Sequence, residues 1–390
     1  MMERDSARLR LAALYTGLIL ASVAVGIARP SIAFYLRYNL GASMLAAAGL
    51  TSGFMTGRSL ASLLAGLIGE YIPGYRWLIV LAGLLASGSI LAVLIPGSSD
   101  PGSVVALMVV WGLVSGLIWP SLQVVTSELA GPRSGLAMSI YFAAGTLGIS
   151  LGNWLFGVLD RPVVELIRAG GLALASSGML LAFSSYGVGY RRGYGLGRAI
   201  GRVLDPVILW VILSAFTLGF LGGILKEYFY LYTHEVYGIS RRALGGLLLL
   251  GGVSAVVAGL AAGFLSDRLG IARVLSAIVL AAGASAIVLG LSPGTTILAL
   301  AYVGAVVGAR ASMPLTRNAA IAGGVGGSMV VGVSNMVSGL GMVTGPLLAG
   351  YLYELSRGYS GLPFIVSGIL LFLVLGLYVG VVRRSRRAGS

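Results

Sequence analysis

Long apolar stretches recur along the whole chain, separated by short runs of Gly, Pro, Ser or Arg. A helix of roughly 20 apolar residues crosses the hydrocarbon core of a bilayer, whereas open strands leave backbone groups there without partners. The pattern therefore predicts an all-α membrane protein with twelve transmembrane helices. The predicted helices cover residues 11–37, 43–68, 77–96, 104–127, 134–158, 164–188, 206–233, 242–265, 272–291, 296–318, 328–353 and 362–382.

The two halves of the chain resemble each other. A shift of 197 positions aligns residues 26–76 with residues 223–273 without a gap, and 13 of the 51 aligned pairs are identical. Such internal similarity indicates a duplicated structural unit. A polar insertion at residues 190–205 separates the copies and is expected to be a cytoplasmic linker. We therefore expect a six-helix bundle over residues 1–189 and a second one over 206–390, related by pseudo-two-fold symmetry.

The composition excludes a soluble protein. Of the 390 residues, 57% are hydrophobic and 10% are charged, whereas soluble domains have roughly a quarter of charged residues. The chain has no cysteine, which excludes disulfides and thiolate metal sites, and its single histidine, His234, argues against a histidine-built metal centre. The sequence has no phosphate-cradling loop and no nucleophile that could pair with the histidine. We expect no enzyme activity, no metal and no cofactor.

The chain is strongly basic, with a formal net charge of +14, and all but one of its 26 basic residues are arginines. In a soluble protein such a basic composition would indicate nucleic-acid binding. Here, however, the arginines flank apolar runs, as expected for loops at a membrane surface. With the N-terminus inside, sixteen arginines fall on the cytoplasmic side and six on the outer side. Because basic residues favour cytoplasmic loops, we expect an integral protein of the cytoplasmic (inner) membrane with both termini cytoplasmic and no nucleic-acid partner.

Short motifs at repeat-related positions resemble those of a known family. Residues 263–273 read GFLSDRLGIAR, close to G-x-L-x-D-R-x-G-R, and the matching residues are Gly263, Asp267, Arg268, Gly270 and Arg273. A degenerate copy in the first half keeps Gly66, Glu70 and Arg76. Residues 341–346, GMVTGP, match a G-x-x-x-G-P element. Together with the helix number and the repeat, these motifs resemble the major facilitator superfamily.

The resemblance implies a transporter whose two halves rock around one central site. It also implies that the G-x-L-x-D-R-x-G-R residues latch the halves together on the cytoplasmic side; the alternative is a loop-shaping turn. Pairs of glycines four residues apart are expected to let helices pack closely rather than to contact substrate. These pairs are Gly53/Gly57, Gly112/Gly116, Gly148/Gly152, Gly219/Gly223 and Gly259/Gly263.

Five ionisable residues fall inside predicted helices. They are Arg29, Arg58, Lys226, Glu227 and Arg310. A charge near the centre of a transmembrane helix costs roughly 2.5–3.5 kcal/mol on insertion scales, so each needs a functional or structural reason. The repeat places Arg29 and Lys226 at equivalent positions, and basic residues there look like those of the family's organophosphate and organic-anion exchangers. We expect all four basic residues to bind substrate; structural pairing inside the protein is the alternative.

Glu227 is the candidate for proton coupling, because a carboxyl group in a dry site can titrate near neutral pH. The alternative is a gate in which Glu227 pairs with Arg29. We therefore expect a monomeric secondary active transporter, coupled to protons, that moves a small organic anion across the lipid bilayer. An exporter of multidrug or amphipathic compounds and a non-transporting membrane receptor with the same fold are the alternatives.

Overall fold

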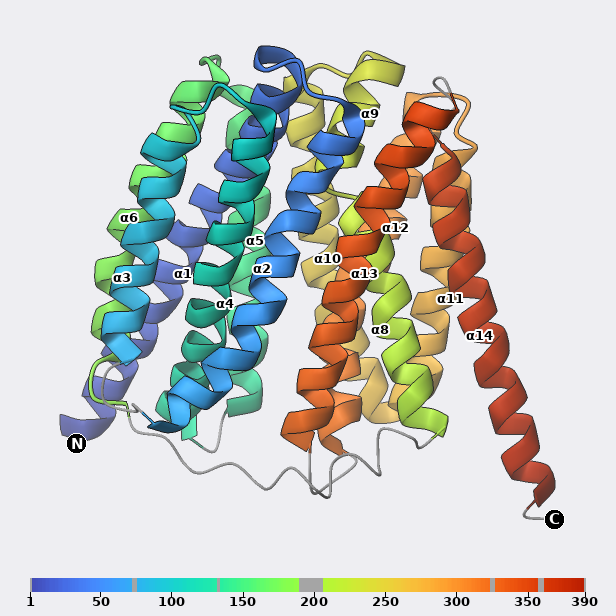
Figure 1. Ribbon diagram of the computed structural model, residues 1–390. Coiled ribbons are helices and arrows are strands. Elements are labelled where there is room, and N and C mark those ends of the chain that lie inside the picture. The colour runs from blue at the N-terminus through green and yellow to red at the C-terminus, as the bar shows by residue number, and fades with distance from the viewer. Residues whose placement is uncertain are drawn as a thin grey trace. The chain divides into compact units, whose positions relative to one another are not determined.

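The computed structural model describes residues 2–71, 76–131, 134–188, 206–322, 327–356 and 361–388 (Figure 1). These residues are helical almost throughout and contain no strand. The chain forms two compact units. The first unit comprises Met1–Arg192 and Thr233–Val253, and the second comprises Gly193–Tyr232 and Ser254–Ser390.

The first unit contains six long helices and two π-helical turns within the described residues. They are α1 (Met2–Phe34), η1 (Tyr35–Asn39), α2 (Met44–Tyr71), α3 (Arg76–Ser89), η3 (Ile90–Leu94), α4 (Pro101–Ala130), α5 (Ser134–Val158) and α6 (Val163–Ser185). Within this unit α1 packs against α5 and α6, α2 against α4, and α3 against α6 (Figure 1). The helix α1 runs without a break through Pro30, and the π-helical turn η1 extends it to Asn39.

The second unit holds α8 and the helices that follow α10, and α9 and α10 each run from one unit into the other. These elements are α8 (Pro206–Ile224), α9 (Glu227–Tyr237), α10 (Arg241–Leu269), α11 (Ile271–Gly290), α12 (Thr295–Ala322), α13 (Gly327–Leu355) and α14 (Leu362–Ala388). Within the unit, α8 packs against α13, and α11 packs against α12 and α14. The sequence places Thr233–Val253 in the second bundle, whereas its packing groups it with the first unit. The predicted linker at 190–205 lies outside the described residues.

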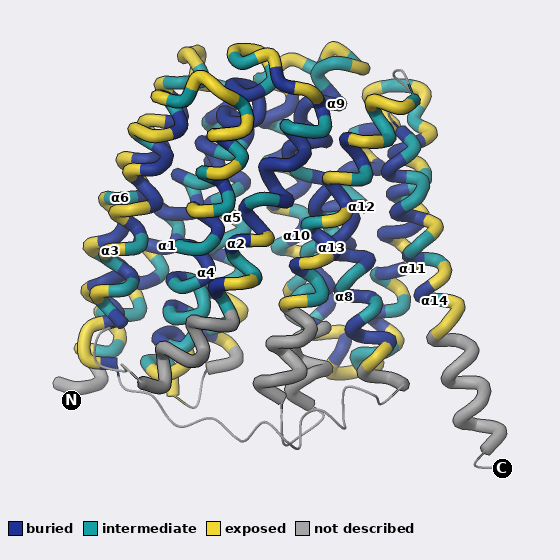
Figure 2. Tube along the Cα trace, viewed as in Figure 1, coloured by how far each residue is buried: buried dark blue, intermediate teal, exposed yellow. Residues whose placement is uncertain are grey.

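The described helices fit a membrane. Nine of them are long and apolar enough to cross a bilayer, and the pair α8 and α9 passes the same test as one bent span. Many of their exposed positions carry large apolar side chains, such as Leu172 on α6 (64% exposed) and Leu300 on α12 (71% exposed). Figure 2 shows exposed positions repeating along the helices between buried ones. Such outward apolar faces suit lipid, and the count of twelve helices stays a prediction.

The predicted helix over 206–233 is interrupted. α8 ends at Ile224, α9 begins at Glu227, and the two axes differ by 46°. In the break the Lys226 backbone N–H donates to the carbonyl of Gly223 at 3.3 Å, a tighter turn than an α-helix makes. Two consecutive glycines, Gly222 and Gly223, precede the break, and glycine weakens a helix because it loses the most backbone entropy on ordering.

The glycine pairs bring helices into backbone contact, as predicted, at most of their positions. A Cβ added at Gly148 would lie 2.8 Å from the carbonyl oxygen of Ile19, inside ordinary van der Waals distance. In the second half, Gly341 on α13 packs in the same way against the carbonyl oxygen of Phe216 on α8. By contrast, a Cβ at Gly263 meets no described atom within 4 Å. Among the described residues, therefore, no helix packs closely against Gly263, and the expectation of close packing was wrong there.

A short loop before α4 carries a titratable cap. The Asp100 carboxylate accepts hydrogen bonds from the Ser103 backbone N–H at 2.8 Å and from the Ser103 hydroxyl at 3.1 Å. These hydrogen bonds stabilise the ionised form and lower the pKa of Asp100 below its ordinary value. Asp100 therefore caps the first turn of α4, where backbone N–H groups lack partners within the helix.

Candidate functional site

Arg29 is fixed by two side chains of α2. Its Nη2 donates to the hydroxyl of Thr51 at 2.9 Å, and its guanidinium carbon lies 5.0 Å from the centre of the Phe54 ring. Arg29 is half-buried, whereas Thr51 and Phe54 are buried. The first of the predicted binding residues thus lies between α1 and α2, and its contacts include this hydrogen bond and this cation–π contact.

Arg58 lies on α2, one helical turn after Phe54, and is half-buried. It is near enough to Arg29 and Tyr141 to interact with both electrostatically. Among the described residues, none forms a hydrogen bond or an ion pair with Arg58. The structure therefore brings two predicted binding residues, Arg29 and Arg58, into one basic cluster of the first unit.

Lys226 and Glu227 lie at the break between α8 and α9 in the second unit. The Lys226 ammonium is half-buried and approaches the sulfur of Met342 on α13 at 3.9 Å. Glu227 is the first residue of α9 and is only 1% exposed. The two side chains thus differ in environment, although they are neighbours in the sequence.

Arg310 lies on α12 of the same unit and is half-buried. It is close enough to Tyr302 to interact with its hydroxyl electrostatically, and the Tyr302 ring stacks on Phe229 with centroids 4.2 Å apart. No described residue forms a hydrogen bond or an ion pair with Arg310. Each unit therefore contains one half-buried arginine, Arg58 or Arg310, without such a partner among the described residues.

The G-x-L-x-D-R-x-G-R residues of the second half lie at the turn between α10 and α11. Gly270 has φ +86°, a left-handed conformation that favours glycine, and it links the two helices directly. Asp267, Arg268 and Arg273 are exposed, and the guanidinium of Arg268 lies over the ring of Phe264, with its central carbon 4.3 Å from the ring centre. The geometry of this turn explains Gly270, whereas the latch role stays a prediction.

The first copy of the motif is described only in part. Gly66 and Glu70 belong to α2, but their surroundings lie outside what the structure describes. Arg76 begins α3 and is 2% exposed, unlike its counterpart Arg273 in the second half. The two copies therefore place their last arginine in different environments.

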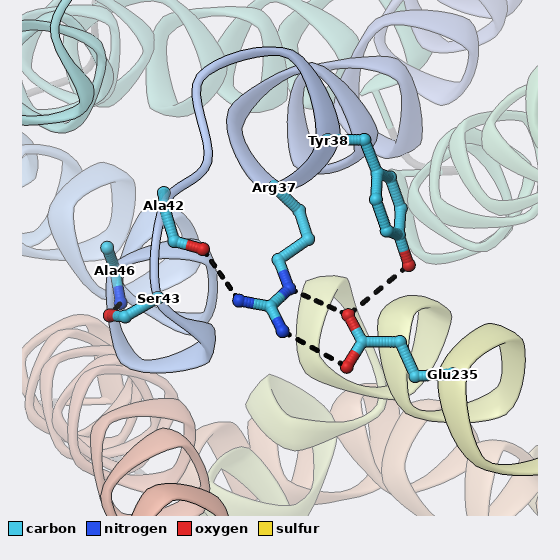
Figure 3. Close-up of polar contacts among 6 residues, drawn as sticks. All are labelled: Arg37, Tyr38, Ala42, Ser43, Ala46 and Glu235. Carbon is cyan, nitrogen blue, oxygen red and sulfur yellow. Dashed lines mark hydrogen bonds and ion pairs between the residues drawn. The ribbon is translucent and has the colours of Figure 1, made fainter.

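Sequence analysis missed a polar cluster at the ends of η1 and α9 (Figure 3). Arg37 donates through Nε and Nη2 to the two carboxylate oxygens of Glu235, at 2.7 and 3.3 Å, and through Nη1 to the carbonyl of Ala42 at 2.7 Å. The Tyr38 hydroxyl donates to the same carboxylate at 3.3 Å. The Arg37 and Glu235 side chains are 27% and 17% exposed. A fork-shaped ion pair of this kind fixes both side chains in orientation.

The segment that follows Glu235 is also packed tightly in the first unit. The guanidinium carbon of Arg241 lies 4.7 Å from the centre of the Phe156 ring, and its Nη2 donates to the Phe156 carbonyl at 3.3 Å. A Cβ added at Gly157 of α5 would lie 2.9 Å from the Cα of Gly245 on α10. This packing explains why Thr233–Val253 groups with the first unit.

One hollow in the described surface is lined by none of these charged residues. It has a volume of about 280 Å³, faces outward between α3 and α6, and is lined by Trp77, Leu81, Met179, Ala182, Phe183 and Tyr186. Its wall is almost entirely apolar. It offers nothing to an anion, so the basic residues remain the candidate site.

Comparison with known proteins gives the family. The sequence profile of the Major Facilitator Superfamily matches residues 14–325. The chain is 29% identical over 153 residues to monocarboxylate transporter 13 of Bos taurus, and 28% identical over 153 residues to that of Rattus norvegicus. These matches cover 38% of this chain and only 36% of each relative.

Solved structures share the fold over nearly the whole chain. The nucleoside transporter NupG has a TM-score of 0.75 at 13% identity, and the human organic anion transporter MFSD10 (TETRAN) has 0.69 at 18% identity; both matches cover 95% of this chain and 99% of the other. A bacterial homologue of the human lysosomal transporter Spinster has 0.72 at 15% identity and covers 96% of each chain. The profile match spans most of the sequence, and the protein therefore belongs to the major facilitator superfamily of membrane transporters.

Proposed function

We propose that this protein is a secondary active transporter that moves a small organic anion, bound by Arg29, Arg58, Lys226 and Arg310. The observation that carries the proposal is the state of Arg58 and Arg310. Both are half-buried in helices of an integral membrane protein, and neither forms a hydrogen bond or an ion pair with a described residue. A charge at membrane depth is retained where it serves a water-filled pathway or a ligand.

The chemistry of these side chains favours an anion. A guanidinium group binds a carboxylate or phosphate through two parallel hydrogen bonds, and it stays charged at any physiological pH. Arg29 and Arg58 are near enough to interact, and two like charges repel each other unless an anion or water screens them. An anion that binds between them would remove this repulsion.

The names of similar proteins support the same substrate class. One relative is called a monocarboxylate transporter, and one structural neighbour an organic anion transporter. Another neighbour is a nucleoside transporter, which makes an uncharged substrate the natural comparison in any assay. We infer a small carboxylate or phosphate ester rather than a nucleoside, because the candidate site is basic.

We infer the remaining architecture from the sequence. In this proposal twelve helices form two six-helix bundles related by pseudo-two-fold symmetry, and both termini are cytoplasmic. The protein works as a monomer in the cytoplasmic membrane. The bundles rock to expose the site to each side in turn, and the motif residues around Asp267 and Arg268 latch the cytoplasmic side. Glu227 carries the coupled proton, because it is buried beside a basic residue.

Counterflow in proteoliposomes tests the proposal. Purified protein is loaded with unlabelled compound and given the same compound with a label, using L-lactate, benzoate, glycerol 3-phosphate, uridine and the cation tetraphenylphosphonium. We expect exchange of at least one anion, lost in Arg58→Ala and Arg310→Ala but kept in Arg242→Ala, since Arg242 is exposed. Exchange of uridine or the cation alone would contradict the proposed substrate class, and binding without exchange would indicate a receptor.

Proton coupling has a separate readout in the same vesicles. An imposed pH gradient should drive accumulation of the transported anion in the wild type. In Glu227→Gln, anion exchange should persist while the gradient no longer drives accumulation, because an amide cannot carry a proton. Accumulation that is unchanged in this variant would exclude Glu227 as the proton carrier.

A further inference from the structure

The cradle of Arg29 is built from side chains that sequence analysis did not single out. The Thr51 hydroxyl accepts a hydrogen bond from Nη2 at 2.9 Å, and the Phe54 ring lies against the guanidinium with a centroid distance of 5.0 Å. The two contacts act in different directions, because one is an in-plane hydrogen bond and the other is made through the face of a ring. Together they restrict both the position and the plane of the guanidinium.

The cradle is itself supported from α4. The buried ring of Trp111 meets the Phe54 ring at 4.9 Å between centroids, with an interplanar angle of 63°. Next to Trp111, Gly112 lets the backbones of α2 and α4 touch, since a Cβ there would lie 2.8 Å from the carbonyl carbon of Phe54. The Phe54 ring therefore has little room to move.

The backbone that carries Arg29 is fixed as well. One turn before it, Gly26 packs against α5, and a Cβ there would lie 2.9 Å from the Cα of Gly152. On α6, a Cβ at Gly170 would lie 3.1 Å from the Cβ of Ala28. With both the backbone and the cradle fixed, the long arginine side chain is restrained at its two ends.

We propose that Thr51 and Phe54 are positioning residues that set the orientation of Arg29 and thereby the affinity of the site for its anion. This inference rests on the proposed function, in which Arg29 binds the anion. A free arginine side chain loses rotamer entropy when it binds a ligand, whereas a pre-oriented one has lost it during folding. Thr51 and Phe54 thus raise affinity without touching the anion.

The variants separate positioning from general packing. Thr51→Val removes the hydroxyl and keeps the shape, Thr51→Ser keeps the hydroxyl, and Phe54→Leu removes the ring. Thr56→Val is the matched control, because it removes the same group from the same helix. The Thr56 hydroxyl donates to the Ser52 carbonyl of its own helix at 2.9 Å rather than holding the guanidinium of Arg29.

Two readouts are measured on each variant in proteoliposomes. The first is the apparent KM and maximal rate for the anion that the wild type exchanges. The second is the rate at which phenylglyoxal, an arginine reagent, modifies Arg29, followed by mass spectrometry, and it needs no substrate. Loss of a hydrogen bond to a charged group should raise KM about tenfold in Thr51→Val, equivalent to about 1.4 kcal/mol, with little change in maximal rate. Phe54→Leu should raise it about threefold, as expected for a weak cation–π contact.

The expected pattern has three parts. Thr51→Val and Phe54→Leu raise both KM and the rate of Arg29 modification, Thr51→Ser restores both values, and Thr56→Val changes neither. If Thr51→Val and Phe54→Leu match Thr56→Val in both readouts, the positioning role is refuted while anion transport stands. If the wild type exchanges no anion, the proposed function fails, and the modification rates alone confirm or refute the positioning of Arg29.

Discussion

Substitution of Gly112 tests whether the contact between α2 and α4 holds the candidate site in place. In Gly112→Ala, the new Cβ would lie 2.8 Å from the carbonyl carbon of Phe54 and 3.0 Å from the backbone nitrogen of Arg58. Ordinary van der Waals contact begins at 3.4 Å, and the carbonyl oxygen of Phe54 lies closer still, so the two helices must separate locally. Both affected residues belong to α2, which also carries the cradle of Arg29.

The free energy follows from two opposing effects. Overpacking against a rigid neighbour typically costs about 1–3 kcal/mol. Alanine favours a helix over glycine by about 1 kcal/mol, which offsets part of this cost. Gly49→Ala on α2 is the matched control, since a Cβ there meets no described atom within 4 Å, and it should gain the helix preference alone. We therefore expect the two variants to differ by about 2 kcal/mol in the free energy of unfolding.

The assay is unfolding of purified protein in mixed detergent micelles, followed by tryptophan fluorescence, combined with anion exchange in proteoliposomes. Gly112→Ala should unfold more easily than the wild type and exchange anion with a higher KM, while Gly49→Ala should unfold no more easily. If Gly112→Ala matches Gly49→Ala in both measurements, the close contact between α2 and α4 does not exist in the protein.

Three further outcomes follow from the geometry. Arg37→Ala should lower the free energy of unfolding by about 1–3 kcal/mol, because it removes both hydrogen bonds from the guanidinium to the Glu235 carboxylate. The double variant Arg37→Glu with Glu235→Arg should restore part of this loss. Gly157→Ala should lower the melting temperature, whereas Gly246→Ala should not, because a Cβ at Gly157 would lie 2.6 Å from a backbone oxygen and one at Gly246 meets no described atom within 4 Å. Since its hydrogen bonds lower the pKa of Asp100, the ionised cap stabilises the fold above the ordinary value of 3.8 and is lost as the pH falls through the lowered value. Melting curves from pH 7 to pH 3 should therefore show Asp100→Ala less stable near neutrality and approaching the wild type in acid; a constant difference would contradict this assignment.

The sequence predicted the fold class because apolar stretches, glycine spacing and arginine distribution are local or periodic signals. Gly148 shows this well, since its spacing to Gly152 indicated a close helix contact that the structure contains. The same four-residue glycine spacing predicted a close helix contact at Gly263, but a Cβ there would meet no described atom within 4 Å. Glycines spaced four residues apart indicate a helix surface that another helix can approach closely. Whether a helix packs there depends on the tertiary fold, which the spacing does not contain.

The contacts of the candidate site residues were harder to predict, because their partners are distant in the sequence. Arg29 stood out as a charge in an apolar helix, whereas Thr51 and Phe54 look like ordinary residues of an apolar helix. Arg37 and Glu235 are 198 positions apart, and both resembled loop charges at a membrane surface. The break at Lys226 had a local signal, the preceding glycine pair, but the lysine was singled out from the sequence as a charge in a continuous helix, and no break was predicted there.

Recognition of a negative charge by the basic residues can be measured by comparing benzoate with its uncharged analogue benzamide. The measurement is the shift in melting temperature of purified protein titrated with each compound, for the wild type, Arg58→Ala, Arg310→Ala and the control Arg242→Ala. Recognition of the charge predicts that benzoate stabilises the wild type and the control, that benzamide does not, and that the benzoate shift is lost in Arg58→Ala and Arg310→Ala. Equal shifts with both compounds, or a benzoate shift that survives both substitutions, would contradict it.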